Sequence, residues 1–460
     1  MTYRESVEWL YASQLFGIRL GLETMRRLCA ALDIDPGVAP AVDRQQLVRA
    51  FPAEPEIVGL QQRAAMQQGN PERPIFIHVA GTNGKGSVCA MLDAILRVAG
   101  WRTGLYTSPH LVTFRERIRL NGEMISEDDV AAGLTRIREL ISGWEPAPTF
   151  FEIVTALALH WFQEQHVHIA VLETGLGGRL DATNVVTPVV SVLTPIARDH
   201  EKYLGATLAE IAAEKAGIIK PGVPVASSAQ SPEVRAVAER VAAECGTVCR
   251  FIDGADATSP GLIASFLAPR AGEEIALEGS HQRANAQLAK LALVSLKTRQ
   301  PPIRVDGWHV QEGLQRVEWP GRFQWVRERF ILDGAHNPAA ATQLAITWRE
   351  VFAYSRPTLI LGVMRDKDVR GVCAALAPIA ARVFAVTVKN PRSCAGSELA
   401  QAMSEVAPTL EVRAFSNLRE ALAAAEPHGG IVLIAGSLFL VGEALVALGL
   451  AEADLESSAQ

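Results

Sequence analysis

Residues 74–89, PIFIHVAGTNGKGSVC, constrain the fold of this chain more than any other stretch. The apolar run 75–79 predicts a buried strand, and the apolar pattern that resumes at residue 88 predicts a helix. A glycine-rich turn that contains Lys85 separates the two. This order of strand, glycine loop and helix is typical of α/β proteins that bind a polyphosphate, because backbone N–H groups and the positive end of the helix face the phosphate oxygens.

The spacing within the loop differs from the strict Walker A pattern. In GTNGKGS, Gly86 separates Lys85 from the hydroxyl residue Ser87, whereas the common pattern places the hydroxyl residue directly after the lysine. The alternative interpretation is a tight turn between a strand and a helix, with a lysine on the surface. The agreement of strand, glycines, lysine, hydroxyl and helix favours a phosphate site.

Composition excludes several classes of protein. The chain has 460 residues, 49% of them hydrophobic and 20% charged, which predicts two or three α/β domains with large cores. The net charge of −6 and the lack of a long basic run argue against nucleic acid as a partner. Six scattered cysteines, with no second close pair to match Cys245 and Cys249, argue against a zinc site and favour reduced thiols in the cytoplasm.

No membrane segment is expected either. The N-terminus lacks the basic and then apolar pattern of a signal peptide. The most apolar stretch, residues 431–450, contains Gly436 and Glu443, and its pattern predicts a strand followed by a helix rather than a membrane span.

Apolar runs alternate with helical patterns along the chain, which predicts parallel sheets in two α/β domains. The first domain, residues 1–300, contains the phosphate loop in a parallel sheet, with further strands at 103–106, 169–172 and 189–193. A Gln-Pro-Pro linker and possible hinge at 300–302 leads to a smaller Rossmann-like α/β domain, residues 301–460. Residues 37–73 are expected to form a surface insertion, whose role as a lid, an oligomer contact or a neutral insertion stays open.

Polar side chains follow three strands of the first domain, namely Ser108, Glu173 and His200. The carboxyl ends of parallel strands meet at one edge of a sheet, so we expect these side chains beside the phosphate loop. A hydroxyl, a carboxylate and an imidazole there could hold one or two Mg²⁺ ions. The alternatives are that Glu173 hydrogen-bonds the glycine-rich turn after it, and that His200 is structural.

Other charged residues in this region also have two interpretations. Lys215, near a helix end, is by default a solvated surface lysine, but its neutral amine could instead add CO₂ and become a carbamate that binds the metal. Arg115, Arg117 and Arg119 alternate along one stretch. The alternation predicts either contacts to an anionic substrate or the solvated face of a strand.

Several segments together are diagnostic of a family, above all GTNGKGS with LETGLGGRLDATN, and further YTSPHL, DHEKYLG, EKAGIIKPG, HQRANA, WPGRF, DGAHNP and GSLFLVGE. With these segments the chain resembles the folylpolyglutamate synthase/dihydrofolate synthase family of the Mur ligase superfamily, from near residue 4 to about residue 447. The resemblance implies a two-domain, ATP-dependent ligase that forms an amide bond through an acyl phosphate. Residues 1–300 would then be a P-loop-containing parallel-sheet ATPase domain, followed by the smaller Rossmann-like α/β domain.

The resemblance also implies roles for individual residues. The ATP-binding residues would be Thr82, Asn83, Gly84, Lys85, Gly86, Ser87, Asn285, Arg322 and Asp333. The metal ligands would be Ser108, Glu173 and His200, and the catalytic residues Lys85, His200 and Lys215 as an N6-carboxylysine. The pterin substrate and the incoming glutamate would contact Leu20, Gly21, Leu22, Thr149, Phe150, Phe151, Glu152, Asp181, His336 and Ser437.

The expected reaction adds L-glutamate to dihydropteroate, to (tetrahydro)folate polyglutamates, or to both, in folate biosynthesis and one-carbon metabolism. ATP would be the co-substrate, one or two Mg²⁺ ions the cofactors and K⁺ a further candidate cofactor, and the enzyme would be a cytoplasmic monomer. One alternative is a Mur ligase acting on a cell-wall precursor. Another, from a different class, is a nucleotide-binding regulatory protein that has lost catalysis.

Overall fold

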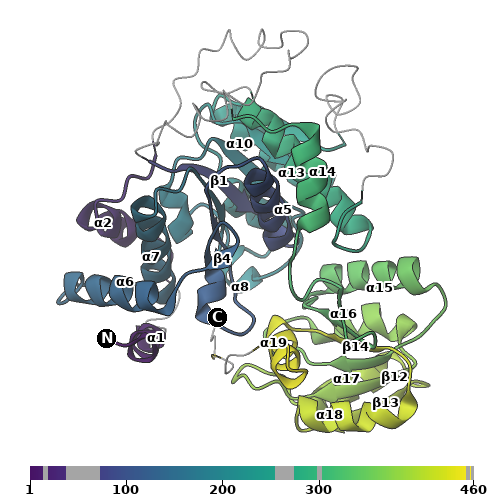
Figure 1. Ribbon diagram of the computed structural model, residues 1–460. Helices are drawn as coiled ribbons and strands as arrows, with labels where there is room; N and C mark the ends of the chain where they lie inside the picture. The colour runs from purple at the N-terminus through teal and green to yellow at the C-terminus, as the bar shows by residue number, and fades with distance from the viewer. Residues whose placement is uncertain (14–18, 38–72, 254–273, 298–302, 452–455, 457–460) are drawn as a thin grey trace. The chain divides into compact units, whose positions relative to one another are not determined.

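The computed structural model (Figure 1) describes residues 1–460 except 14–18, 38–72, 254–273, 298–302, 452–455 and 457–460. The chain divides into two compact units. The first contains Met1–Ser108, Arg117–Glu274 and Ala284–Arg316, and the second contains Pro109–Glu116, Ile275–Arg283 and Val317–Gln460. Each unit is built on its own mainly parallel sheet, which confirms the predicted fold class. The predicted insertion at 37–73 and the Pro301-Pro302 hinge lie almost entirely outside the described residues.

The first sheet has eight strands in the order β4-β3-β2-β5-β1-β6-β7-β8. Its strands are β1 (Ile75–Ala80), β2 (Thr103–Tyr106), β3 (Ile118–Leu120), β4 (Glu123–Met124), β5 (Ile169–Glu173), β6 (Val190–Leu193), β7 (Val225–Ser227) and β8 (Cys249–Phe251). β1 lies in the interior of the sheet and pairs in parallel with β5 and β6. β3 pairs antiparallel with both β2 and β4, so among the described strands of this sheet it alone runs against the others, and the carboxyl ends of β1, β2, β5, β6, β7 and β8 share one edge.

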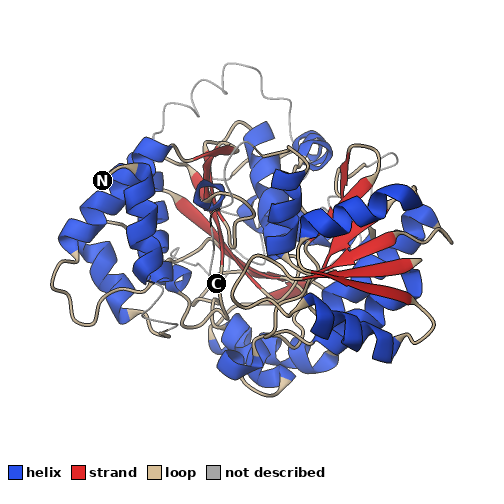
Figure 2. Ribbon diagram, turned by 90° about the horizontal axis from the view of Figure 1, so that it is seen from below, coloured by secondary structure: helices blue, strands red, loops and turns tan. Residues whose placement is uncertain are grey.

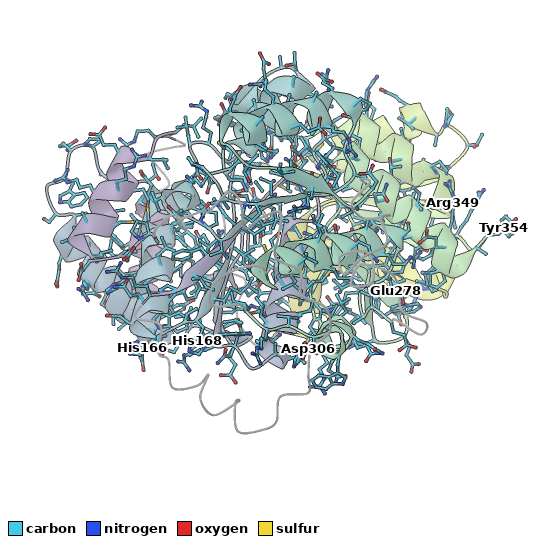
Figure 3. All side chains as sticks on the ribbon, turned by 90° about the horizontal axis from the view of Figure 1, so that it is seen from above. His166, His168, Glu278, Asp306, Arg349 and Tyr354 are labelled. Atoms are coloured by element: carbon cyan, nitrogen blue, oxygen red, sulfur yellow. The ribbon has the colours of Figure 1, made fainter. Side chains whose placement is uncertain are left out.

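The helices of the first unit pack on this sheet and on one another, and Figure 2 draws them in blue beside the red strands. They are α1 (Tyr3–Ala12), α2 (Glu23–Ala31), α5 (Lys85–Val98), α6 (Glu127–Leu140), α7 (Phe150–Glu164), α8 (Glu201–Leu204), α9 (Leu208–Ala216), α10 (Pro232–Glu244), α13 (Ser280–Lys297) and α14 (Gly307–Arg316). Threonine side chains begin three of them with reciprocal capping boxes, namely Thr2, Thr149 and Thr207. His166 and His168 lie close together in the connection from α7 to β5 (Figure 3).

The division between the units differs from the predicted boundary at 300/301, because α14 groups with the first unit. α14 packs directly against α5. At Gly313 the two backbones come so close that an added Cβ would lie 2.5 Å from the Cα atom of Ile95. A glycine is therefore required for this helix contact, and the contact holds α14 on the first unit.

The second sheet has the order β13-β12-β11-β14-β10-β9, with only β9 antiparallel. Its strands are β9 (Gln324–Val326), β10 (Phe330–Asp333), β11 (Thr358–Leu361), β12 (Arg382–Val386), β13 (Glu411–Phe415) and β14 (Val432–Ala435). Two hydrophobic cores cover its two faces. One includes α15 (Pro338–Phe352), α16 (Val369–Leu376) and α17 (Gly396–Val406), and the other α18 (Leu418–Ala425) and α19 (Leu438–Ala447).

The second unit also contains the most apolar stretch of the sequence and an exposed tyrosine. The apolar stretch 431–450 forms β14 and α19, as predicted, and within the described ranges no helix is long and apolar enough to cross a membrane. Tyr354, just after α15, is 99% exposed and projects from the molecule (Figure 3).

Candidate active site

The glycine loop joins β1 to α5 and leaves no room for side chains at two positions. Gly84 has a φ of 86°, and an added Cβ would lie 2.8 Å from Oδ1 of Asn285. Gly81 has a φ of 149°, and an added Cβ would lie 1.9 Å from Oγ1 of Thr194. The left-handed backbone and the close neighbours explain the glycines, and Asn285 lies beside the loop at Gly84.

Thr82 and Asn83 tie the loop to the segment that follows β6. Their backbone N–H groups donate to the carbonyl oxygen of Pro195, at 2.9 and 3.2 Å. The Thr82 hydroxyl donates to the carbonyl oxygen of Ala197 at 3.0 Å and accepts from the Ala197 N–H at 3.1 Å. These hydrogen bonds fix the start of the loop on the segment that follows β6. The expected phosphate cradle, residues 82–87, thus runs from this fixed point into the first turn of α5.

Three predicted residues meet at the carboxyl end of β5. Glu173 is the last residue of the strand and is buried, and its Oε1 lies 3.8 Å from Nζ of Lys85. The backbone N–H of Ser108 donates to Oε2 of Glu173 at 3.2 Å. Lys85 also donates to the carbonyl oxygen of Thr82 at 3.3 Å. A lysine and a carboxylate thus face each other beside the loop.

His200 lies in a different setting. It precedes α8 with a φ of 54°, a left-handed backbone that is uncommon for residues other than glycine. Its side chain is 40% exposed, and its Nε2 lies 3.9 Å from Oδ2 of Asp199. Within the described ranges, no three His, Cys, Asp or Glu side chains come together as a metal site. The carboxylate of Glu173 and the hydroxyl of Ser108 are nevertheless donors that suit Mg²⁺, which retains several waters and phosphate oxygens and needs few protein ligands.

Lys215 is not the solvated lysine that is the default for such a position. It is 4% exposed, in the last turn of α9, and its Nζ donates to the carbonyl oxygen of Gly81 at 2.8 Å. The neighbouring backbone explains the burial, because the glycine-rich segment packs on this turn. An added Cβ at Gly178 would lie 2.7 Å from the carbonyl oxygen of Lys215. Lys215 therefore reaches the first residue of the phosphate loop.

Asp181 organises the glycine-rich turn between itself and Glu173. Its Oδ2 accepts the N–H groups of Gly175 and Leu176, at 2.9 and 2.8 Å. Its Oδ1 accepts the N–H and the hydroxyl of Thr183. Burial raises the pKa of Asp181, and these hydrogen bonds oppose the increase. Asp181 thus accepts the hydrogen bonds from this turn that the alternative interpretation assigned to Glu173.

The residues predicted to contact a pterin lie around α7. Thr149 caps the helix, and its N–H and hydroxyl donate to the carboxylate of Glu152 at 2.8 and 2.7 Å. Phe150 stacks on Tyr11 with ring centroids 5.8 Å apart, and Phe151 lies 6.0 Å from the ring of Tyr106. The turn that contains Leu20, Gly21 and Leu22 leads into α2, which contacts α7.

Arg117 is a residue of this region that the sequence patterns misplaced. The alternation of arginines predicts either contacts to an anionic substrate or the solvated face of a strand, but a 3₁₀ helix spans Phe114–Arg117, and β3 begins only at Ile118. Arg117 is fully buried, with its guanidinium carbon 5.5 Å from the centre of the Phe150 ring. The solvated strand face is therefore wrong for Arg117, and no sequence signal marked it as a buried cation.

In the second unit, Asp333 ends β10 as Glu173 ends β5. Its Oδ2 accepts the N–H of Phe323 at 2.9 Å, and its Oδ1 accepts the N–H of Ala335 at 2.8 Å. Burial raises the pKa of Asp333, and the nearby Arg322 guanidinium opposes the increase. Arg322 and Asp333, predicted separately from two motifs, are thus brought together.

Other polar residues of this unit have local structural partners. His281, which is not among the predicted site residues, lies close enough to Asp333 for the carboxylate to affect the pKa of His281. Burial nevertheless lowers the pKa of His281, whose Nδ1 lies 3.3 Å from Oγ1 of Thr347. His336 donates from Nδ1 to the carbonyl oxygen of Gly334 at 2.9 Å. Ser437 caps α19, where it accepts the N–H of Phe439 at 3.0 Å.

Comparison with known proteins decides the family. Residues 79–229 match the Mur ligase middle domain, and residues 321–438 match the Mur ligase glutamate ligase domain. A dihydrofolate synthase/folylpolyglutamate synthase of Bacillus subtilis is 33% identical over 458 residues, which cover 96% of this chain and 98% of that protein. The chain belongs to the folylpolyglutamate synthase/dihydrofolate synthase family. It is accordingly an ATP-dependent ligase that forms amide bonds.

Solved structures of this family have the same fold. The structure of E. coli FolC in complex with DHPP and ADP has a TM-score of 0.79 and 28% identity, with 98% of each chain covered. The bifunctional folylpolyglutamate synthase/dihydrofolate synthase of Yersinia pestis, complexed with AMPPNP and a Mn ion, has a TM-score of 0.78 and 28% identity, again with 98% of each chain covered.

Proposed function

We propose that this ligase adds L-glutamate to dihydropteroate, to (tetrahydro)folate polyglutamates, or to both, with ATP as co-substrate. The observation that carries the proposal is the arrangement of charges around the phosphate loop. Lys85 lies 3.8 Å from Glu173, and Lys215 donates to the loop itself at Gly81. The names of the B. subtilis relative and of the E. coli and Y. pestis structures, with their bound DHPP, ADP and AMPPNP, support the choice of substrates.

The reaction has two steps. A carboxylate oxygen of the pterin substrate attacks the γ-phosphorus of ATP, the bond from that phosphorus to the β–γ bridging oxygen breaks, and ADP leaves with an acyl phosphate formed. Lys85 stabilises the charge that moves onto the leaving oxygen. The amine of glutamate then attacks the acyl carbon and loses a proton, and phosphate leaves with the former carboxylate oxygen.

One or two Mg²⁺ ions would be bound by Ser108, Glu173 and His200. K⁺ is a further candidate cofactor. When bound, Mg²⁺ neutralises phosphate charge. Lys215 would act as a carbamate. Nucleotide contacts fall to Asn285, Arg322 and Asp333 together with the loop residues 82–87, and contacts to glutamate to His336 and Ser437.

Leu20, Gly21 and Leu22, the residues Thr149, Phe150, Phe151 and Glu152, and Asp181 would form the pterin site. The aromatic pairs around Phe150 and Phe151 support this assignment, because a pterin ring stacks well on aromatic faces. The cytoplasmic location and the monomeric state expected from the sequence remain part of the proposal.

Release of ADP in the presence of L-glutamate, measured separately with dihydropteroate and with tetrahydrofolate, tests the proposal. Release with one or both acceptors, dependent on glutamate, is the expected result. A UDP-muramoyl acceptor should give none, and release with that acceptor alone would favour the cell-wall ligase. No ADP with any pterin acceptor would favour the inactive regulatory protein.

A further inference from the structure

One buried histidine has no part in the reaction described so far. His78 lies in the middle of β1, between Leu172 of β5 and Ser191 of β6, and it is fully buried. A histidine at this place is unexpected, because a central strand of a parallel sheet is covered on both faces and is normally apolar. The side chain must therefore have a specific partner, since a buried polar group without one costs free energy.

That partner is Thr183, which follows Asp181 in the motif DATN. Nε2 of His78 lies 2.8 Å from Oγ1 of Thr183. The Thr183 hydroxyl in turn donates its only proton to Oδ1 of Asp181. Since the threonine proton is used, His78 must donate from Nε2 to Thr183.

The other ring nitrogen agrees with this direction. Nδ1 of His78 has no hydrogen-bond partner among the described residues. A ring nitrogen without a proton is cheaper to leave unpaired than an N–H, so the neutral ring carries its proton on Nε2. Burial also lowers the pKa of His78 to about 3, which keeps the ring neutral at physiological pH.

The chain of donors ends on the turn that follows Glu173. Asp181 receives the Thr183 hydroxyl on one oxygen and holds the N–H groups of Gly175 and Leu176 on the other. Those residues lie two and three positions after Glu173 in the sequence. The same motif also bonds the turn from its far end, because Nδ2 of Asn184 donates to the carbonyl oxygen of Arg179 at 2.9 Å.

We propose that His78 is a positioning residue, which fixes the turn after Glu173 through the hydrogen-bonded chain His78–Thr183–Asp181. Hydrogen bonds in such a chain polarise one another, so the neutral imidazole strengthens the hydrogen bonds between Asp181 and the turn. The inference rests on the proposed function in one respect only, the assignment of Glu173 to the metal.

Hydrogen exchange of the full-length protein tests the chain without any assay of activity. In Thr183→Val the hydroxyl is lost at constant shape, and the amides of Gly175 and Leu176 should exchange about tenfold faster or more. Thr183→Ser keeps the hydroxyl and should stay within about twofold of the wild type. His78→Leu, which leaves the Thr183–Asp181 bond in place, should give a smaller acceleration. Wild-type exchange of this turn in a folded Thr183→Val variant would overturn the proposal.

Two further measurements make the test independent of a single variant. Nitrogen-15 NMR of the wild-type histidines should show His78 as the neutral Nε2–H tautomer, and the Nδ1–H tautomer would overturn the proposed donor direction. Calorimetry of ADP binding should show affinity about tenfold weaker in Thr183→Val with Mg²⁺ and unchanged without it, and equal losses in both would contradict a role at Glu173. An ADP affinity of the wild-type protein that does not depend on Mg²⁺ would refute the assignment of Glu173 as a metal ligand. The hydrogen-exchange result would still test the hydrogen-bonded chain His78–Thr183–Asp181.

Discussion

At the carboxyl edge of each sheet, one parallel strand ends in a residue with a buried carboxylate, but the two carboxylates have different hydrogen-bond and charge partners. Glu173 faces the side chain of Lys85 at 3.8 Å and accepts a long backbone hydrogen bond of 3.2 Å from Ser108. Asp333 accepts two backbone N–H groups from its own unit, from Phe323 and Ala335, at 2.9 and 2.8 Å.

This difference separates a reacting edge from a supporting edge. A lysine on a flexible stem can move from a carboxylate to a phosphate, which leaves the carboxylate to a metal ion. A carboxylate that bonds two backbone N–H groups is fixed, and it can orient neighbouring groups such as the Arg322 guanidinium. We therefore expect changes at the first edge to affect turnover with little loss of stability, and changes at the second to lower stability in addition to weakening the nucleotide contacts proposed for Asp333.

Removal of the lysine is the largest predicted effect. Lys85→Ala should lower kcat for ADP release by about 10³-fold or more, because a preorganised charge at the leaving phosphate is lost. Arg240→Ala removes a positive charge from the surface of α10 and serves as the matched control, with unchanged kcat expected. A Lys85→Ala enzyme with nearly normal kcat would remove the basis for calling this edge reactive.

The next effect concerns Lys215, whose Nζ bonds the loop at Gly81. Lys215→Ala should lower kcat by about 10²-fold, and short carboxylic acids such as acetate should restore part of it by taking the place of a carbamate. Rates are compared with and without the added acid at constant ionic strength. A complete lack of rescue would count against the carbamate, although not against the hydrogen bond to the loop.

A pair of isosteric changes tests the comparison most evenly. Glu173→Gln should lower activity by about 10²-fold with little change in Tm, since loss of the carboxylate charge affects the binding of the metal ion and of the nucleotide. Asp333→Asn places an NH₂ group against a backbone N–H and should lower the free energy of unfolding by about 1–3 kcal/mol. Thermal unfolding and ADP release are measured on both variants. The reverse outcome, a stability loss at Glu173 and none at Asp333, would invert the two roles.

The smallest effect is a pH dependence of stability from His78. Its folded-state pKa of about 3 lies below the unfolded value of about 6.5, so between these pH values the unfolded chain binds a proton that the native protein does not. Stability should therefore fall as pH drops below 6.5, by about 1.4 kcal/mol per pH unit from this group. Urea unfolding at pH 7 and pH 5 should show a drop that is about 2 kcal/mol smaller in His78→Leu than in the wild type. An equal drop in both proteins would contradict the buried neutral imidazole.

Much of this structure could be predicted because periodicity and glycine patterns are local signals. The strand at 75–80, the loop and the helix from Lys85 follow from neighbouring residues, and the alternation of strands and helices gives two parallel sheets. The ends of parallel strands share an edge, so Ser108, Glu173 and Lys85 could be placed together without coordinates.

What could not be predicted depends on tertiary contacts. The burial of Lys215 depends on the packing of α9 against the glycine-rich segment, and that of Arg117 on a 3₁₀ turn in place of a strand. The partners of Thr82 and His78 come from segments about a hundred residues further along the chain. No local pattern encodes such hydrogen bonds, so the bonds between the Thr82 hydroxyl and Ala197 could not be predicted from the sequence.

The central claim is that ATP activates the carboxylate of the acceptor at the edge that contains Lys85 and Glu173. Isotope transfer tests it most directly: the acceptor is labelled with ¹⁸O in its reacting carboxylate, and the phosphate released with glutamate and ATP is analysed by mass spectrometry. An acyl phosphate requires one carboxylate oxygen to leave with each phosphate, so we predict one ¹⁸O atom in the phosphate for each amide bond formed. Phosphate without ¹⁸O, at normal yield of the amide, would contradict the account.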